Sequence, residues 1–488
     1  MLLKRTAAAL LLVLGTSQLA NASPYVGTQD KQLHYDLQTL VEFGYLDLAV
    51  STYPVPWKGV ASGLDAISTD GMPFRARQAY LRLNHYLSLN KQQRNRRFLT
   101  LQAASDEVRF RSLDDGTEDT GKVSISSEFY LGRWSAQVTA NYVAGGKKNF
   151  DNSFIAYQYG GWNLRLGSLD QWWGPAQSSS LVMSNNSRPI KALALSRSVN
   201  TASDSPWLGW MGPWYFITQV GQLEKARAVP EARILMSRFN SRPFKGFEFG
   251  FSWTAMWAGD GQPGDVDAFL DLITFEEGCS GGRVCAEGEY ASTRGNHMAG
   301  FDFSYTMQVF DRPFSVYAQR VGEDLKDGYN IVDNANLIGF STYIDNTKIF
   351  VETSDTRVDC GGAEFLTRGD CFYEDGEYQT GYRIYERSFG STFDSDAKQL
   401  TIGANIRFEN GEYAEVYLRS AQLNADGSRP SPVLNRDVSE DVLELSGFYQ
   451  KPMGAWLVKA GGSIASRQYQ TAENEVDAVV YLKAQYAF

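Results

Sequence analysis

Apolar and polar side chains alternate along most of this chain, from residue 98 to its last residue. The segments 134–142, 301–309 and 400–408 each place five apolar side chains on one face and four polar or small residues on the other. A period of two residues is the period of a β-strand and does not suit a helix. We therefore expect the chain from residue 98 onward to fold as β-sheet, in strands of about 9 to 13 residues.

The alternation fits a soluble β-sandwich as well as a membrane barrel, and three features favour the barrel. The strands are longer than the usual length of about five or six residues and suit a tilted bilayer crossing. Their polar faces carry Asn, Gln and charges of both signs, as the wall of a wet lumen does. Their apolar faces often begin or end in Tyr, Trp or Phe, as membrane interfaces require. We expect an all-β transmembrane barrel.

Turn lengths give the number and direction of the strands. In bacterial barrels the short turns face the periplasm and the long loops face the outside. Counting back from Phe488, short and long connections alternate and give about eighteen antiparallel strands. This count places the segment 170–175 at the outer end of the barrel. The short turns fall at 241–246, 311–313, 345–348, 409–412 and 451–454, and the long connections at 258–297, 356–397 and 421–439.

The first 22 residues have the composition of a cleavable secretory signal. They begin with Lys4 and Arg5, continue with an apolar run over 7–14 and end in Ala-Asn-Ala, so the mature chain is expected to begin at Ser23. A membrane anchor is the alternative, although the apolar run is too short to span a bilayer. Together with a barrel, the signal predicts the outer membrane of a Gram-negative bacterium.

Residues 23–95 are predicted to form a small helical bundle. Apolar residues recur there at helical spacing, as in Leu33, Leu37 and Leu40. About 65 residues bury little core by themselves, so the bundle needs a surface to dock on. The nearest surface is the periplasmic mouth of the barrel formed by 96–488, and we expect the bundle to plug that mouth.

Composition limits the partners of the chain. A formal net charge of −10 argues against nucleic acid, which requires a basic stripe, and gives no reason to expect attraction to anionic lipid. After the first twenty residues, no stretch is apolar enough to cross a bilayer as a helix. The expected partners therefore include the outer-membrane lipid around the barrel and no nucleic acid, and we expect a monomer.

The four cysteines form two local pairs, Cys279 with Cys285 and Cys360 with Cys371, each within a polar, Gly-rich loop. Because an exported chain meets oxidising conditions, we expect two short-range disulfides, with reduced cysteines as the alternative. His297 is the nearest histidine to any of the four and lies outside both loops. A zinc site therefore has little support, and we expect no metal and no cofactor.

The sequence gives little support for an enzyme. It has no Gly-x-Ser-x-Gly elbow, and no two of its three histidines stand at metal-ligand spacing. Its carboxylate pairs, such as Asp114 with Asp115, lie in loops where water solvates them. We therefore expect no catalytic residues.

Three stretches make this chain similar to a known family: "LQTLVEFGYLDLAVSTYPVPWKGV", "GSLDQWWGPAQSSSLVMSNNSRPIKALALSR" and "GYRIYERSFGSTFDSDA". Over nearly its whole mature length the chain resembles the Wzi family of outer-membrane capsule-assembly proteins. The resemblance implies an eighteen-stranded barrel, a periplasmic helical plug, and binding of exported capsular polysaccharide at the cell surface without catalysis. Relatives often carry a His after the Gly of the third stretch. Ser391 and Thr392 stand there, so no role of that His carries over.

Two stretches contain the residue types that bind sugars. Flat aromatic rings pack on the C–H faces of sugars, and planar polar groups bind their hydroxyls and carboxylates. The Trp pair could instead anchor a loop inside the barrel or lie in the lipid interface, and the arginines could belong to a lumen salt-bridge network. The predicted polysaccharide-binding residues are Asp170, Trp172, Trp173, Asn185, Asn186 and Arg188, with Tyr382, Arg383 and Arg387, which flank Tyr385.

Two functions remain in competition. The first is a surface lectin that holds exported capsular polysaccharide at the cell surface. The second is a porin, because eighteen strands can enclose a water-filled pore. The helical bundle favours the lectin, since a bundle docked on the barrel mouth would close the pore.

Overall fold

The structure, a computed structural model, describes most of the mature chain. The expected signal segment 1–22 and the expected disulfides, Cys279–Cys285 and Cys360–Cys371, lie outside the described residues. The structure describes residues 24–91, 95–114, 119–275, 295–326, 330–358, 372–375, 377–427 and 438–488.

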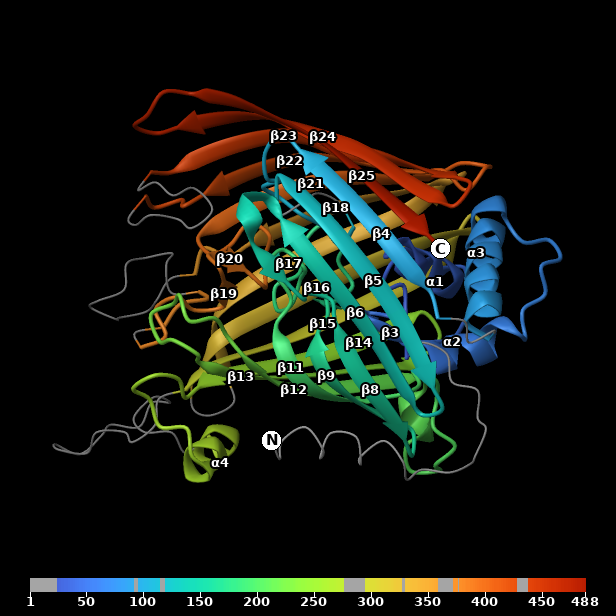
Figure 1. Cartoon of the computed structure of the whole chain (residues 1–488), viewed down its shortest axis with the longest axis horizontal. Helices are drawn as coiled ribbons and strands as arrows, with labels where there is room; N and C mark the ends of the chain where they lie inside the picture. The colour runs from blue at the N-terminus through green and yellow to red at the C-terminus, as the bar shows by residue number, and fades with distance from the viewer. Residues whose placement is uncertain are drawn as a thin grey trace, which may run out of the picture.

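Nineteen of the described strands form one closed antiparallel barrel (Figure 1). β7 and β8 both pair with β6 and form one interrupted strand, so the barrel has eighteen strand positions and the predicted count is confirmed. The barrel closes where β25 pairs with β4, from Tyr481 opposite Ala104 to Ala487 opposite Phe98. The strands are β4 (Arg97–Ala104), β5 (Gly121–Leu131), β6 (Trp134–Val143), β7 (Lys148–Asn149), β8 (Phe154–Tyr159), β9 (Trp162–Ser168), β11 (Lys191–Arg197), β12 (Trp214–Gln222), β13 (Arg233–Phe244), β14 (Phe247–Trp257), β15 (Asn296–Val309), β16 (Arg312–Lys326), β17 (Asn330–Ile344), β18 (Thr347–Asp355), β21 (Ala397–Arg407), β22 (Tyr413–Leu423), β23 (Glu440–Met453), β24 (Trp456–Tyr469) and β25 (Glu475–Ala487).

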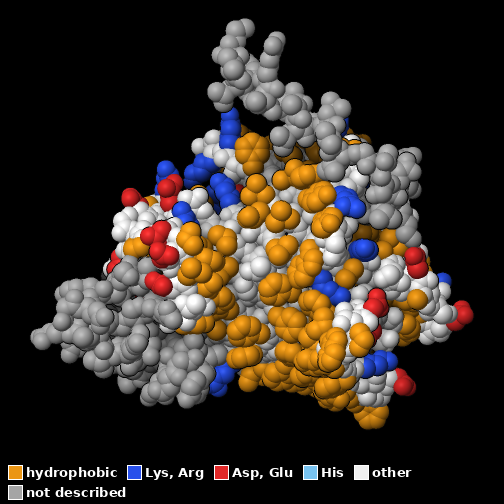
Figure 2. All heavy atoms as spheres, turned by 90° about the horizontal axis from the view of Figure 1, so that it is seen from below, with side chains coloured by type: hydrophobic (Ala, Val, Ile, Leu, Met, Phe, Trp, Pro, Cys, Tyr) orange, Lys and Arg blue, Asp and Glu red, His pale blue; other side chains and the backbone are white. Residues whose placement is uncertain are grey.

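The outward faces of the strands are apolar, as the alternation predicts. Ile125 and Phe301 are 54% and 55% exposed, whereas their neighbours Ser126 and Asp302 point inward and are buried. Figure 2 shows such hydrophobic side chains gathered on the outer wall. An exposed apolar wall around a polar interior is stable in the hydrocarbon of a bilayer, so this is a barrel of the outer-membrane type.

The helices α1, α2 and α3 lie together at one end of the barrel, where the short turns are (Figure 1). The Arg75 guanidinium of α3 donates a hydrogen bond of 2.6 Å to the carbonyl of Asn346, in the turn between β17 and β18. Glu42 of α1 forms an ion pair of 2.8 Å with Lys348, just after that turn. None of the helices in the described residues is both long and apolar enough to span a bilayer. The helices are α1 (Gln32–Glu42), α2 (Trp57–Leu64), α3 (Phe74–Lys91) and α4 (Val266–Thr274), with the short 3-10 helices η1 (Ala144–Gly146) and η2 (Gly209–Met211).

Helix α1 is buried on both faces, which explains its residue pattern. Leu33, Leu37 and Leu40 are at most 3% exposed and join the apolar core that α1 forms with α2 and α3. Asp36, beside this stripe on the helix, forms ion pairs with Arg407 of the barrel wall and with Arg82 of α3. The apolar stripe thus holds the helices together, and Asp36 links them to the wall.

Several short strands fill the interior of the barrel. β10 pairs with β2, β1 pairs with β3, and β19 and β20 form a hairpin. Two long connections, between β9 and β11 and between β18 and β21, therefore fold inward instead of extending into solvent. These strands are β1 (Tyr25–Val26), β2 (Thr52–Tyr53), β3 (Val55–Pro56), β10 (Trp172–Trp173), β19 (Arg383–Ile384) and β20 (Arg387–Ser388).

Candidate functional site

The connection between β9 and β11 turns back into the lumen. Its residues Trp172 and Trp173 form β10, which pairs with β2 of the N-terminal segment. The carbonyl of Trp173 accepts a hydrogen bond of 3.1 Å from the side chain of Gln319, in the middle of β16. The expectation that the segment 170–175 lies at the outer end of the barrel is therefore wrong. β9 does run outward, but the chain that follows it descends inside the barrel.

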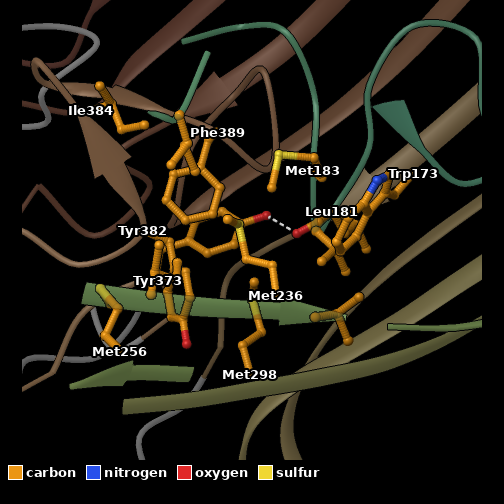
Figure 3. Close-up of a cluster of buried hydrophobic side chains, with 14 of the residues drawn as sticks. Trp173, Leu181, Met183, Met236, Met256, Met298, Tyr373, Tyr382, Ile384 and Phe389 are labelled. Atoms are coloured by element: carbon orange, nitrogen blue, oxygen red, sulfur yellow. Dashed lines mark hydrogen bonds between the residues drawn. The ribbon is translucent and has the colours of Figure 1, made fainter. Parts of the chain in front are cut away.

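Both tryptophan rings are buried, at 2% and 0% exposed for Trp172 and Trp173. The ring N–H of Trp172 donates a hydrogen bond of 3.0 Å to the carbonyl of Ala176. Trp173 belongs to the large lumen core, where it lies near Leu181 and Met183 (Figure 3). This arrangement agrees with the alternative interpretation of the pair, in which it anchors a loop inside the barrel.

The inserted backbone satisfies charged groups of the barrel wall. Glu352 of β18 is fully buried and accepts hydrogen bonds from the backbone N–H groups of Gln177 and Ser178, at 2.5 and 2.8 Å. It also accepts one of 2.7 Å from the hydroxyl of Tyr317. A buried carboxylate needs such partners, so the polar wall and the inserted segment stabilise each other.

Two of the predicted binding residues tie the inserted segment to other parts of the chain. Asp170 forms an ion pair of 2.6 Å with Lys31, in the N-terminal segment. The side-chain amide of Asn185 donates a hydrogen bond of 2.5 Å to the carbonyl of Leu113, in the connection after β4.

Tyr382 and Arg383 are also interior residues. The Tyr382 hydroxyl donates a hydrogen bond of 2.8 Å to the carbonyl of Asn296. Arg383 forms ion pairs of 2.7 Å with both Asp394 and Glu374. Burial alone would lower the pKa of Arg383, but these two carboxylates outweigh it and raise the pKa above its ordinary value. Arg383 is thus a permanent cation that holds its connection together, in a salt-bridge network of the kind expected as the alternative to ligand binding.

The hairpin of β19 and β20 presents an aromatic ring at its tip. Tyr385 and Glu386 form the two-residue turn, both with positive φ, and Tyr385 is 51% exposed. The backbone N–H of Tyr385 donates a hydrogen bond of 3.1 Å to Glu224, which fixes the tip. The Arg188 guanidinium lies 4.7 Å from the centre of the Tyr385 ring and forms an ion pair of 2.6 Å with Asp151.

Arg387 follows the same hairpin tip. Its guanidinium donates hydrogen bonds to the side-chain oxygen of Asn186 at 3.1 Å and to the carbonyl of Arg109 at 2.8 Å. Its side chain is 25% exposed, and Glu107 lies 3.9 Å away. These contacts orient the guanidinium while part of it still faces solvent.

We name Tyr385, Arg188 and Arg387, with the carboxylates of Asp151 and Glu107, the rim site. Its members come from the connections after β4, β7, β9 and β18, which all lie opposite the short turns and therefore on the outer side. The rim site joins an exposed aromatic face to two oriented guanidinium groups. Such an arrangement can pack on the C–H face of a sugar and bind its hydroxyls or a carboxylate.

The structure brings together only part of the predicted set. Asn186 and Arg387 are in contact, and Arg188 lies beside the ring of Tyr385. The other predicted residues lie in the interior. Sequence reasoning missed Asp151 and Glu107, because they belong to other connections and nothing near them in the sequence points to the hairpin. The described residues contain no group of three or more His, Cys, Asp or Glu side chains that could hold a metal ion.

The comparison with protein families decides the relationship of this barrel. The family model described as capsule assembly protein Wzi matches residues 90–480. The chain belongs to the Wzi capsule assembly family. Ser391 and Thr392, which stand after the Gly of the third stretch, are buried, and the Ser391 N–H donates a hydrogen bond of 2.9 Å to the hydroxyl of Tyr373.

Two proteins are similar to this Wzi-family chain over much of its length. It is 28% identical over 344 residues to an uncharacterised 55.8 kDa protein in the cps region of Klebsiella pneumoniae, and the match covers 67% of this chain and 64% of that protein. The solved structure of Wzi from Escherichia coli has the same fold, with a TM-score of 0.77 and 20% identity. That match covers 94% of this chain and 98% of the other. The E. coli protein is described as an outer-membrane protein involved in group 1 capsule assembly and as a carbohydrate-binding β-barrel.

Proposed function

We propose that this barrel is a non-enzymatic surface lectin that holds exported capsular polysaccharide at the outer membrane through its rim site. The observation that carries the proposal is the position of Tyr385, which is 51% exposed, has the Arg188 guanidinium over its ring and stands two residues before Arg387. Among the predicted aromatic residues, Trp172, Trp173 and Tyr382 are buried. The description of E. coli Wzi as a carbohydrate-binding barrel supports the same function.

The chemistry of the rim site suits an extended glycan. One face of the Tyr385 ring is covered by Arg188, and stacking on the remaining surface would bury sugar C–H groups. The ion pair of Arg387 with Glu107 is longer than that of Arg188 with Asp151, at 3.9 Å against 2.6 Å. Both guanidinium groups are planar donors that suit a ligand carboxylate or hydroxyl.

We assign a different role to the interior members of the predicted set. They position the connections that carry the rim site, through the contacts described above. The positioning residues are Asp170, Trp172, Trp173, Asn185, Asn186, Tyr382 and Arg383.

The helical segment 23–95 is proposed as a plug of the periplasmic end. Its support is the set of contacts that α1 and α3 make with the short-turn end of the wall, including Arg75 with Asn346 and Glu42 with Lys348. The plug covers the periplasmic end and the inserted connections fill the lumen, so we propose that the barrel does not conduct. We also propose that the functional unit is a monomer.

The test is to incubate the purified protein in detergent with fluorescently labelled surface polysaccharide. We expect saturable binding, and we expect the length distribution of the glycan to stay unchanged after prolonged incubation. An equal mass of an unrelated outer-membrane barrel serves as the control. Binding no greater than that of the control would contradict the lectin, and shortening of the glycan would contradict the non-enzymatic assignment.

A further inference from the structure

Helix α4 lies in the connection between β14 and β15, outside the barrel and at the end opposite α1, α2 and α3 (Figure 1). Its first turn is capped by Asp265, whose carboxylate accepts a hydrogen bond of 2.9 Å from the N–H of Ala268. It ends at Phe275, which adopts a left-handed conformation with φ of 56°. The helix therefore has defined ends and is a folded element of the outer side.

One side of α4 packs on the outer wall of the barrel. Leu272 is fully buried and forms a cluster with Leu235 of β13 and Trp257 of β14. Along the same strands, Met236 and Met256 point the other way and join the lumen core. Leu235 and Trp257 therefore occupy outward positions, where the rest of the wall faces lipid.

A second side of α4 is apolar and exposed. Val266, Leu270 and Ile273 stand at spacings of four and three residues, so they form one stripe along the helix. They are 71%, 46% and 37% exposed. Asp267 and Asp271 project from another side, because they stand one residue after Val266 and Leu270, about 100° further around the helix. The helix is thus amphipathic, and its packing on the barrel wall does not explain the exposed apolar stripe.

The height of α4 matches the edge of the apolar band. Trp257, on which α4 packs, is ten residues along β14 from Phe247, and Phe247 lies at the short-turn end of the strand. Ten steps of about 3.4 Å in a strand tilted by about 40° rise about 26 Å. The apolar band of an outer-membrane barrel is about 25 Å tall. With the lower edge of the band at Phe247, this rise places the helix where the outer leaflet meets its head groups.

The exposed stripe continues the lipid-facing wall. Phe275, at the end of α4, is 53% exposed and lies 5.5 Å from the ring of Trp253, measured between ring centres. Trp253 is an outward residue of β14, and its outward neighbour Phe251 packs on Phe301 of β15, at 5.1 Å between ring centres. Apolar surface thus runs from the wall to the C-terminal end of the helix.

We propose that α4 is an interfacial helix whose stripe of Val266, Leu270 and Ile273 inserts among the acyl chains of the outer leaflet. An amphipathic helix lying in the plane of the interface buries its apolar side in this way. The acidic side, with Asp267 and Asp271, then faces the head groups and water. The helix would fix the height of the barrel, and with it the height of the rim site, relative to the membrane surface.

Site-specific photo-crosslinking tests this placement in the full chain, reconstituted in bilayers that contain lipopolysaccharide. Leu270→p-benzoylphenylalanine probes the stripe, and Asp267→p-benzoylphenylalanine is the matched control on the acidic side of the same helix. After irradiation we expect a lipid or lipopolysaccharide adduct at position 270, several-fold more abundant than at position 267, by mass spectrometry.

Three results would overturn the proposal. Equal lipid adducts at the two positions would show that the stripe has no preference for lipid. A crosslink from position 270 to a second copy would make the stripe a protein interface. A crosslink to residues 276–294 of the same chain would mean that the chain itself covers the stripe. Normal heat-modifiable migration of each variant on gels confirms that the barrel has folded.

Discussion

The side chain of Asn186 bridges the two inserted connections by contacting Arg387 and its neighbour. Its oxygen accepts a hydrogen bond of 3.1 Å from the Arg387 guanidinium, and its N–H donates one of 3.0 Å to the carbonyl of Ser388. Asn186 is 3% exposed, so a ligand cannot reach much of it. The residue therefore acts on the rim site by fixing Arg387.

Asn186→Ala is predicted to weaken glycan binding without unfolding the barrel. The loss of a buried hydrogen bond to a charged group costs about 1.5–3 kcal/mol. If about half of that loss appears in binding, glycan affinity falls severalfold to about tenfold. Binding of labelled glycan measures the effect, with Asn84→Ala on the exposed face of α3 as the control. Full affinity in Asn186→Ala would show that Arg387 needs no such support.

Trp173→Ala is predicted to act on stability first. Trp173 is completely buried in the lumen core, and removing a buried tryptophan side chain costs about 3–5 kcal/mol. We expect a lower midpoint of urea unfolding in detergent micelles, and any loss of glycan binding should follow the loss of folded protein. A variant with unchanged stability and no glycan binding would instead make Trp173 a direct contact.

The filled lumen predicts a closed barrel. In planar bilayers the intact protein should show little or no steady conductance. Replacing the inserted residues 174–186 by a short Gly/Ser linker should produce measurable current, because it removes the backbone that covers Glu352. Stable large single-channel steps from the intact chain would favour the porin function instead.

His34 predicts a loss of plug stability in acid. Burial, and to a smaller extent the charge of Lys348, lowers the pKa of His34 from 6.5 to about 3. Between these two values the unfolded chain binds a proton that the folded chain does not. The contribution of His34 therefore favours the folded state above pH 6.5 and declines as the pH falls from 6.5 toward 3.

Limited proteolysis of the full chain across this pH range, with cleavage followed within residues 24–91, measures the effect of His34. His34→Gln is the comparison, since a glutamine keeps hydrogen-bonding groups near Gln38 and does not titrate. We expect cleavage of the native chain to rise more steeply below pH 6.5 than cleavage of the variant. Parallel pH profiles would show that His34 does not contribute to the acid response.

The fold could be predicted from the sequence because the two-residue alternation of apolar and polar side chains indicates which face of a strand meets lipid. Phe301 and Asp302 are adjacent, and their exposure of 55% and 6% follows from the alternation alone. Turn lengths then gave the strand count. The helix that contains Leu33, Leu37 and Leu40 could also be predicted, from their helical spacing, and all three lie in one core.

The paths of the long connections could not be predicted in this way. Ser178 contacts Glu352 across 174 residues of sequence, and no local pattern encodes that contact. A run of Ser and Asn suits a solvated loop. It equally suits a segment that fills the lumen and makes hydrogen bonds to the polar groups of the wall. The sequence therefore identified Arg188 and Arg387 as candidate contacts, whereas the burial of Trp172 and Trp173 depended on pairings that only the structure shows.

The most direct test of the rim site is the affinity of labelled surface polysaccharide for the protein carrying Tyr385→Ala and Arg387→Ala together. The matched control is Lys225→Ala, an 82% exposed side chain of another outer connection. We predict that the double variant keeps the unfolding midpoint of the native protein and loses at least about tenfold in affinity, equivalent to about 1.4 kcal/mol, while the control binds normally. Native affinity in a folded double variant would contradict the rim site as the place where this barrel holds its glycan.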